Sequence, residues 1–243
     1  MTKKFLSRIF CAAAILLFAL SPRPLFAKSV NAELQVVFWS RESSLADLFV
    51  KSGGIYRKLN GAAFALTKSS LGYSGESVVD VFEKSGGGYV KCAEFEIPEG
   101  AQKCLVAIGP ATRFFDSDED LGYEPKFGAD AMEFVDKGYG DGTLSVLNFS
   151  TLSLRARVVG CEPVVLKPKT AEKIYSLAAG EKSADVDFRI VTAAKDAESA
   201  HKAWRVGNSM RVVSSQRYFI AVVPGRKREG KPPQCEIFSI RAE

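Results

Sequence analysis

The sequence of 243 residues has few of the side chains on which catalytic and metal sites depend. It contains one histidine, His201, and no Cys-x-x-Cys motif, so it supports neither a zinc site nor a thioredoxin-like redox centre. The stretch LGYSGE at residues 71–76 lacks the Gly-x-Ser-x-Gly spacing of a nucleophile elbow. Glu94 and Glu96 share one strand face, which is a weak signal for glycosidase chemistry. We therefore expect a protein that is not an enzyme and needs no cofactor.

Long apolar runs are also scarce. The main one covers residues 9–20, which is shorter than the roughly 20 residues that a membrane-spanning helix needs. Basic residues precede this run, and the tail SPRPLFA follows it and ends at Ala27, a pattern typical of a secretory signal peptide. We predict that residues 1–27 are removed and that the mature chain begins at Lys28. It would then be periplasmic or secreted, with no transmembrane segment.

Helical periodicity is nearly absent, and short runs of alternating apolar residues recur between Gly, Pro, Ser and Asn. The strands expected in the first half are 34–39, 47–51, 55–59, 62–66, 77–82, 90–97 and 105–108. Those expected in the second half are 144–149, 154–159, 164–166, 186–192, 210–213, 218–223 and 236–240. About seven short strands per 100 residues is typical of a β-sandwich. The sequence therefore predicts an all-β protein with two antiparallel, Ig-like β-sandwich domains in tandem.

The expected boundaries follow composition. A first sandwich would cover residues 28–115, an acidic and Gly-rich linker residues 116–141, and a second sandwich residues 142–243. Within the linker, either a strand at 132–135 or an amphipathic helix at 129–137 is compatible with the pattern, and we favour the strand. A helical turn or two is expected at 194–203. Each sandwich is expected to fold when it is expressed separately.

The two halves share a sequence pattern. The stretch LSVLNFS at residues 144–150 matches LQVVFWS at residues 34–40, a shift of 110 residues. Each is followed by a strand, a Gly-centred turn and a second strand, which predicts two copies of one topology. Asn148 belongs to an Asn-x-Ser glycosylation triplet, but its place near a strand end favours an amide that caps the following turn.

Charge is divided unevenly between the halves. Residues 28–136 carry 11 basic and 17 acidic side chains, a net charge of −6, whereas residues 137–243 carry 18 and 11, a net charge of +7. Such asymmetry indicates either an anionic partner for the basic half or attraction between the halves, and we favour attraction.

Four cysteines would remain after cleavage: Cys92, Cys104, Cys161 and Cys235. An oxidising compartment permits three connectivities. Pairing within each half closes the shorter loops and predicts the disulfides Cys92–Cys104 and Cys161–Cys235. Strand phase opposes the first pair, because inward-facing Phe95 and Ile97 would turn Cys92 outward.

Alternating carboxylates at Asp116, Asp118 and Asp120 resemble the start of a calcium loop, since Ca²⁺ prefers six to eight oxygen ligands. The resemblance ends at the sixth position, which is Leu121 instead of Gly, and at the twelfth, which is Phe127 instead of Glu. We favour a solvated acidic linker over a weak calcium site.

A basic hairpin tip is the other charged feature, formed by Arg226, Lys227, Arg228 and Lys231. It could contact anionic lipid headgroups or acidic polysaccharide, or it could simply keep a sheet edge soluble, which we favour. Nucleic acid is not expected, because export would separate the chain from it and no aromatic residues interleave with the basic ones. Trp39 and Trp204 could stack on sugars, but a rim or core-edge position is more common.

The pattern of apolar strand, Asn-x-Ser, Gly turn, Trp204 and the strand RYFIAV at 217–222 is similar to exported bacterial proteins of unknown function with two small β-sandwiches. The opening LQVVFWSRESSLADLFVKSGG also resembles small cell-surface sandwich domains. The resemblance implies export and a sandwich fold and supplies no catalytic residues. The sequence thus predicts a non-enzymatic, envelope-associated interaction or structural module whose partner is a protein or an envelope glycan. The alternative is a carbohydrate- or calcium-binding module.

Overall fold

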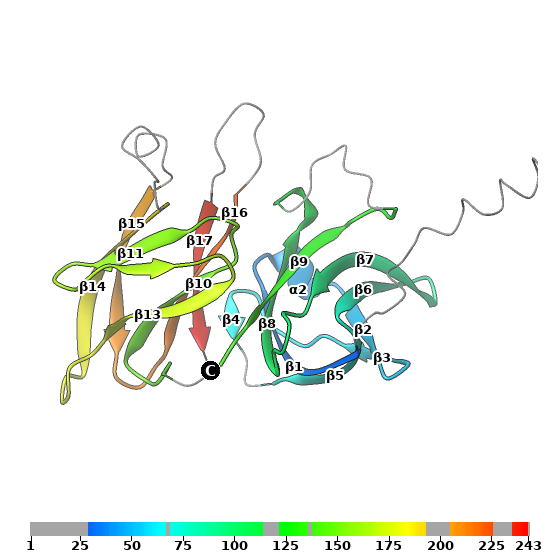
Figure 1. Ribbon diagram of the computed structural model, residues 1–243, viewed down its shortest axis with the longest axis horizontal. Coiled ribbons are helices and arrows are strands. Elements are labelled where there is room, and N and C mark those ends of the chain that lie inside the picture. The colour runs from blue at the N-terminus through cyan, green and yellow to red at the C-terminus, as the bar shows by residue number, and fades with distance from the viewer. Residues whose placement is uncertain are drawn as a thin grey trace, which may run out of the picture.

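The computed structural model describes residues 29–66, 69–113, 122–135, 138–192, 205–225 and 235–242. Its strands form two β-sandwiches in tandem (Figure 1), which confirms the predicted fold class. The helical segments among these residues are single turns, α2 (Arg41–Leu45) and the 3₁₀-helix η1 (Ala111–Arg113). Ser40 caps α2, because its side-chain oxygen accepts a hydrogen bond from the Ser43 amide at 3.1 Å.

The first domain consists of two four-stranded sheets. Its inner sheet, which faces the second domain, has the order β5 (Leu71–Glu76), β1 (Ser29–Phe38), β8 (Lys103–Pro110) and β9 (Phe127–Glu133). Its outer sheet has the order β3 (Ile55–Lys58), β2 (Leu48–Ser52), β6 (Val78–Ser85) and β7 (Gly88–Glu96). All neighbours run antiparallel except β1 and β8, which are parallel.

The second domain repeats this arrangement. Its inner sheet has the order β13 (Thr170–Ser176), β10 (Thr143–Asn148), β16 (Tyr218–Pro224) and β17 (Cys235–Ala242). Its outer sheet has the order β12 (Val164–Leu166), β11 (Leu154–Val158), β14 (Ser183–Thr192) and β15 (Arg205–Val213). The short strand β4 (Ala65–Leu66) from the first half joins the edge of this inner sheet beside β17.

The predicted repeat is confirmed in both strand order and register. Leu34 of β1 pairs with Cys104 of β8, and Leu144 of β10 pairs with Tyr218 of β16, so the shift of 110 residues superimposes the first strands. Both pairs are parallel. The eight main strands of one domain therefore correspond in order to the eight of the other.

Two strands were not predicted, β5 and β13. Strand β5 has two glycines in six residues, and β13 is largely exposed, so neither shows a clear apolar alternation. Both lie at the edges of their sheets, where one side is unpaired and fewer side chains need to be buried.

The predicted linker over residues 116–141 is wrong for residues 127–133, which form β9 and pair with β8 along its whole length. A strand at 132–135 was favoured over a helix in this segment. The observed strand β9 begins five residues earlier, at Phe127. Residues 116–121 and 194–203 lie outside the described residues.

Each sandwich has its own hydrophobic core. Alternate residues of β1, Leu34, Val36 and Phe38, point into the first core. In β10, Leu144 and Val146 point into the second core. Asn148 occupies the position on the same face that corresponds to Phe38 in β1. The Asn148 amide donates to the carbonyls of Leu152 and Lys167, both at 2.9 Å. The expected turn cap is therefore present, and the Asn148 side chain is fully buried.

A third core joins the two inner sheets face to face. It contains Val37, Trp39, Leu66, Leu105, Ala107, Met132 and Phe134 from the first domain and Leu147, Phe149, Phe219, Ala221, Val223 and Ile240 from the second. The molecule is thus four layers deep, with an outer sheet at each end (Figure 1). Inner strands buried on both faces explain the nearly continuous apolar runs of β8 and β16.

The contact between domains is mainly apolar. An ion pair also crosses it, from Lys169 Nζ to Asp130 Oδ1 at 2.8 Å. Burial raises the pKa of Asp130, and Lys169 opposes this shift. This pair joins the basic half to the acidic half, and attraction between the oppositely charged halves stays a prediction. A fragment of residues 28–115 would also lack β9 and expose its side of the third core, so independent folding does not follow from this architecture.

Candidate functional site

The four cysteines of the expected mature chain are free thiols, and the predicted disulfides are absent. A β-bulge explains the orientation of Cys92. Val81 pairs with Ala93 and Phe82 pairs with Lys91, so Cys92 is the extra residue of β7 and the side-chain alternation shifts there. Cys92 consequently points into the first core, where its thiol donates to the Val81 carbonyl at 3.4 Å.

Strand length keeps the members of each predicted pair apart. The Cys92 carbonyl accepts a hydrogen bond from the Lys126 amide at one end of β9, whereas Cys104 pairs with Glu133 at the other end. Cys235 begins β17, and its thiol lies close enough to Ser150 to bond with it. Cys161 lies in the turn beyond the far end of β11. A separation of one strand length exceeds the Cα distance of about 7 Å that a disulfide allows.

In the mature chain, Cys161 is expected to be the only cysteine that reacts quickly with a thiol reagent at pH 8, because it is exposed and the others are buried. Burial raises the pKa of Cys92 to about 12 and that of Cys104 to about 11. Thiol titration under native and denaturing conditions measures this difference. Fast labelling that survives Cys161→Ser would contradict it.

The same pKa shifts predict the direction of pH dependence. A thiol whose pKa is raised by folding contributes stability that is complete below its unfolded pKa of about 8.5 and is lost as the pH rises through the folded value. Stability should therefore decline between about pH 9 and 12.

Several predicted site residues lie outside the described residues. These are Asp116, Asp118 and Asp120 of the expected calcium loop, Arg226, Lys227, Arg228 and Lys231 of the basic tip, and His201 and Trp204. The calcium site and the anionic contact at the tip stay predictions. Within the described ranges, no three His, Cys, Asp or Glu side chains come together to hold a metal ion.

Trp39 is part of the third core and is not a sugar-stacking surface. Its side chain is 7% exposed, and its ring centroid lies 6.0 Å from that of Phe238. The ring lies directly over Gly109 of β8, where a Cβ atom would be 1.4 Å from Trp39 Nε1. Gly109 is therefore required for this close approach.

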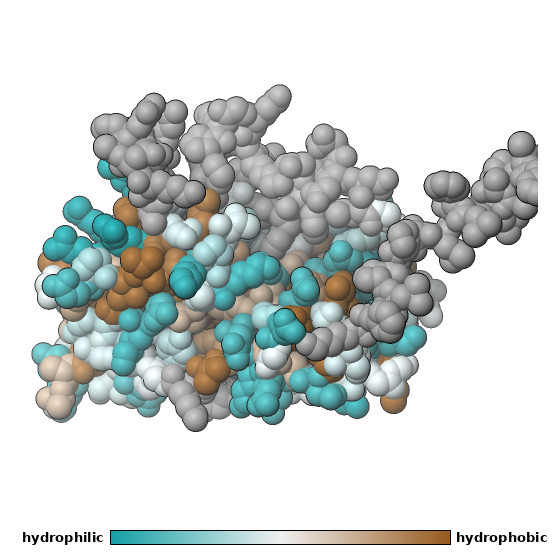
Figure 2. Space-filling view, viewed as in Figure 1, coloured by the Kyte–Doolittle hydropathy of each residue, from teal (hydrophilic) through white to brown (hydrophobic). Residues whose placement is uncertain are grey.

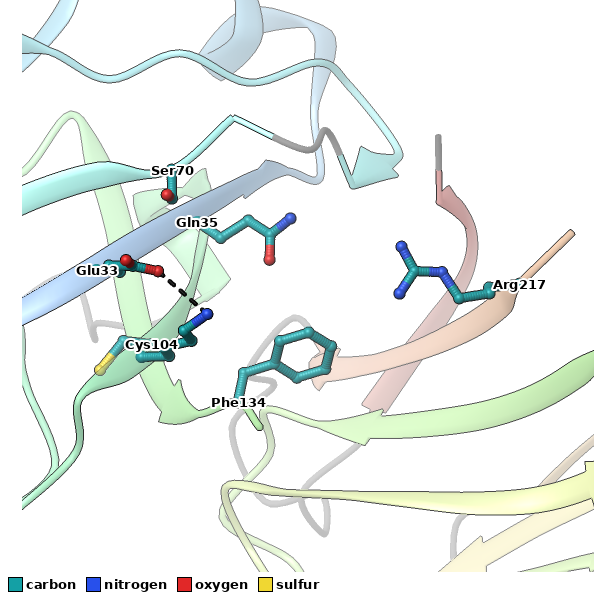
Figure 3. A pocket seen from close by; sticks show the side chains of 7 residues that line it. Glu33, Gln35, Ser70, Cys104, Phe134 and Arg217 are labelled. Carbon is teal, nitrogen blue, oxygen red and sulfur yellow. Dashed lines mark ion pairs between the residues drawn. The ribbon is translucent and has the colours of Figure 1, made fainter. Parts of the chain in front are cut away.

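A small cavity of about 160 Å³ opens at the junction of the domains. It is lined by Glu33, Gln35, Ser70, Lys103, Cys104, Phe134 and Arg217. Figure 3 shows Arg217 reaching from the second domain toward Gln35 and Phe134 of the first. Arg217 Nη1 donates to the Tyr139 carbonyl at 3.5 Å. Lys103 and Glu33 pair at 3.3 Å, but both are more than half exposed, so this pair adds little to stability.

The cavity has no arrangement suited to nucleophilic catalysis. The pKa of Cys104 is raised to about 11, so its thiol is protonated at neutral pH, and in Figure 3 its sulfur points away from the cavity. The volume is also below the roughly 300 Å³ at which ligand pockets usually begin. The cavity can accommodate a few water molecules or a small polar solute.

A cluster of four aromatic side chains lies on the outward face of the first domain's outer sheet. We call it the aromatic face, and it consists of Phe49, Tyr56, Phe82 and Tyr89, one from each strand. The rings of Tyr56 and Tyr89 stack with centroids 3.7 Å apart, and Phe49 meets Tyr89 edge-on at 5.1 Å. The sequence alternation on β2 and β6 suggested which residues point outward, but only the register brings these four together.

Polar side chains cover most of the molecular face in Figure 2, and hydrophobic ones form separate groups, including one near β11. Exposed hydrophobic residues of the second domain's outer sheet and the turn after β11 include Val159 and Val165. No helix in the described part of the chain has the length and hydrophobicity needed to cross a bilayer.

Comparison with known proteins does not assign the chain to a family. The sequence matches no model of a protein family, and it has no significant match among curated proteins. The resemblance to exported two-sandwich proteins stays a prediction.

Proposed function

We propose that the protein is an exported, non-enzymatic module of the cell envelope that acts through interaction surfaces. The observation that supports this proposal most directly is the aromatic face. Its four rings lie on the outward side of this sheet, where Tyr89 is 37% exposed and the other three rings are half-buried. Tyrosine and phenylalanine are enriched in interaction surfaces because each ring contributes a large contact area at low conformational cost.

The architecture supports the same role. The third core joins two copies of one sandwich through their inner sheets, so the outer sheets face away from each other on opposite sides. Each outer face is then held at a fixed distance from the other and is available to a separate partner. Interaction modules commonly present such surfaces from rigid strands.

Carbohydrate binding is the second candidate function, and the aromatic face favours it as well. Flat aromatic rings that expose one side can pack against sugar rings, and tyrosine adds a hydroxyl group for hydrogen bonding. Lysines surround the cluster on the same surface. Among them, Lys91 is neutralised by Asp80 at 2.7 Å and by Glu94 at 2.6 Å.

Affinity isolation of the tagged mature chain from its own envelope tests the proposal. We expect reproducible partners to be captured by the parent protein and lost when Tyr56→Ser and Tyr89→Ser are combined, because these changes remove the stacked pair. Ile55→Ser is the matched control, since Ile55 is 64% exposed beside Tyr56 but points to the other side of the strand.

Capture that is unchanged by the tyrosine substitutions would contradict the role of the aromatic face. A rise in melting temperature with a neutral oligosaccharide, lost in the same variant, would favour carbohydrate binding. Turnover of a generic ester or glycoside substrate would overturn the non-enzymatic proposal.

A further inference from the structure

The outer sheet of the second domain presents arginine side chains on the surface that faces away from the first domain. Their neighbours along β11 and β14 are buried in the second core, so the arginines point outward. We call this surface the arginine face, and it consists of Arg155 and Arg157 on β11, Arg189 on β14 and Arg205 on β15. All four are exposed.

Strand register brings these arginines side by side. Arg157 pairs directly with Arg189, and Val191 lies between Arg155 and Arg205 in the next row across the sheet. Like charges that lie directly opposite each other on neighbouring strands destabilise a sheet. The Arg157–Arg189 pair is therefore unfavourable for the fold by itself.

The described residues do not neutralise this charge. None of the four guanidinium groups makes an ion pair or hydrogen bond with any residue that the structure describes. Lys91 on the other outer sheet differs, because Asp80 and Glu94 flank it. Positive charge is thus left available to an external anion.

The aliphatic part of the Arg189 side chain lies next to β15. Its partner on β15 is Gly207, which has no side chain, and a Cβ atom there would lie 3.5 Å from Arg189 Cγ. Neighbouring strands are about 4.8 Å apart, so the arginine face extends over about 10 Å from β11 to β15. That width can accommodate more than one acidic group of a chain.

We propose that the arginine face binds an acidic polysaccharide whose chain runs across β11, β14 and β15. The planar guanidinium group matches the two oxygens of a carboxylate or sulfate, and a bridging anion would relieve the repulsion between Arg157 and Arg189. The inference rests on the proposed interaction role outside the cytoplasm, but it concerns the opposite outer sheet from the aromatic face.

A flat anionic membrane fits this surface less well. Asp185 and Asp187 lie on the same face farther along β14, where Arg211 is opposite Asp185 and Ser209 donates a hydrogen bond to Asp187. A bilayer that covered the sheet would press its charge against both carboxylates. A narrow polysaccharide chain that follows the rows of arginines leaves the carboxylates of Asp185 and Asp187 exposed to water.

The experiment measures binding of the mature chain, residues 28–243, to immobilised polygalacturonate at low salt. Neutral dextran and vesicles of phosphatidylcholine with phosphatidylglycerol are the comparison surfaces. We expect binding to polygalacturonate, none to dextran, and loss of binding as sodium chloride screens the charges. Arg157→Gln combined with Arg189→Gln should weaken the affinity at least about tenfold, because two charge-assisted contacts are removed.

The matched control is Arg41→Gln combined with Arg57→Gln, which removes the same charge from exposed positions in the first domain. It should change the affinity by less than about twofold. Because the test variant relieves a like-charge pair, its melting temperature should not fall, so unfolding cannot explain a loss of binding.

Three results would overturn the inference. Equal losses in the test and control variants would show that net charge alone is responsible. Binding to the anionic vesicles without binding to polygalacturonate would favour a membrane. Absence of polygalacturonate binding, with envelope capture through the aromatic face intact, would remove this inference and leave the proposed function standing.

Discussion

Replacement of Phe219 by aspartate is expected to abolish the folded state of the whole chain. Phe219 is fully buried in the third core, where its ring lies 5.9 Å from those of Phe134 and Tyr139. An unpaired carboxylate there costs several kcal/mol, which is comparable to the total stability of about 5–15 kcal/mol of a typical domain. The milder change Phe219→Ala should lower the free energy of unfolding by about 3–5 kcal/mol.

Urea denaturation followed by circular dichroism measures both variants. Val165→Asp is the matched control, because Val165 is 55% exposed on the second domain's outer sheet and its replacement should change stability by at most about 0.5 kcal/mol. A Phe219→Asp protein that unfolds at the same urea concentration as the parent would show that the third core contributes little. The two sandwiches would then be independent.

Replacement of Gly109 by alanine is expected to lower the melting temperature by about 6–12 °C, which corresponds to about 3 kcal/mol for a chain of this size. The added Cβ would lie 1.4 Å from Trp39 Nε1 and 1.9 Å from Cε2, so the ring must move. Movement is costly because Trp39 packs against Phe238 inside the third core. Overpacking of a filled core is destabilising even when the added group is a single methyl.

Gly72→Ala is the control for this substitution. Gly72 lies in β5 of the same inner sheet, and a Cβ atom there would meet nothing within 4 Å. The melting temperature of the Gly72→Ala protein should stay near that of the parent protein. Thermal unfolding of the two variants side by side isolates the steric effect, and equal melting temperatures would show that Trp39 has room to shift.

The strands with strong patterns could be predicted from local sequence. The run from Leu34 to Phe38 and its counterpart from Leu144 to Asn148 revealed both the sandwich class and the duplication, because a buried strand must carry apolar side chains wherever it faces a core. Edge strands β5 and β13 carry weak patterns, since an edge needs less burial. Their absence from the prediction has this physical cause.

The cysteine prediction failed because the members of each pair lie about one strand length apart. The bulge in β7 turns Cys92 into the core that also contains Cys104, but the two cysteines lie near opposite ends of β9. The distance between Cys161 and Cys235 depends on where β11 ends relative to β17, and the spacing of cysteines along the chain does not contain that information.

The sequence by itself determined the all-β class, the strand-turn-strand repeat and the uneven distribution of charge, because these follow from residue type and from contacts between near neighbours. Tertiary structure alone decided the third core, the aromatic face and the arginine face. Arg157 and Arg189 are 32 positions apart in the chain yet lie opposite each other in the sheet. Pairing between distant strands sets such neighbours, and this register depends on the burial of all the strands together.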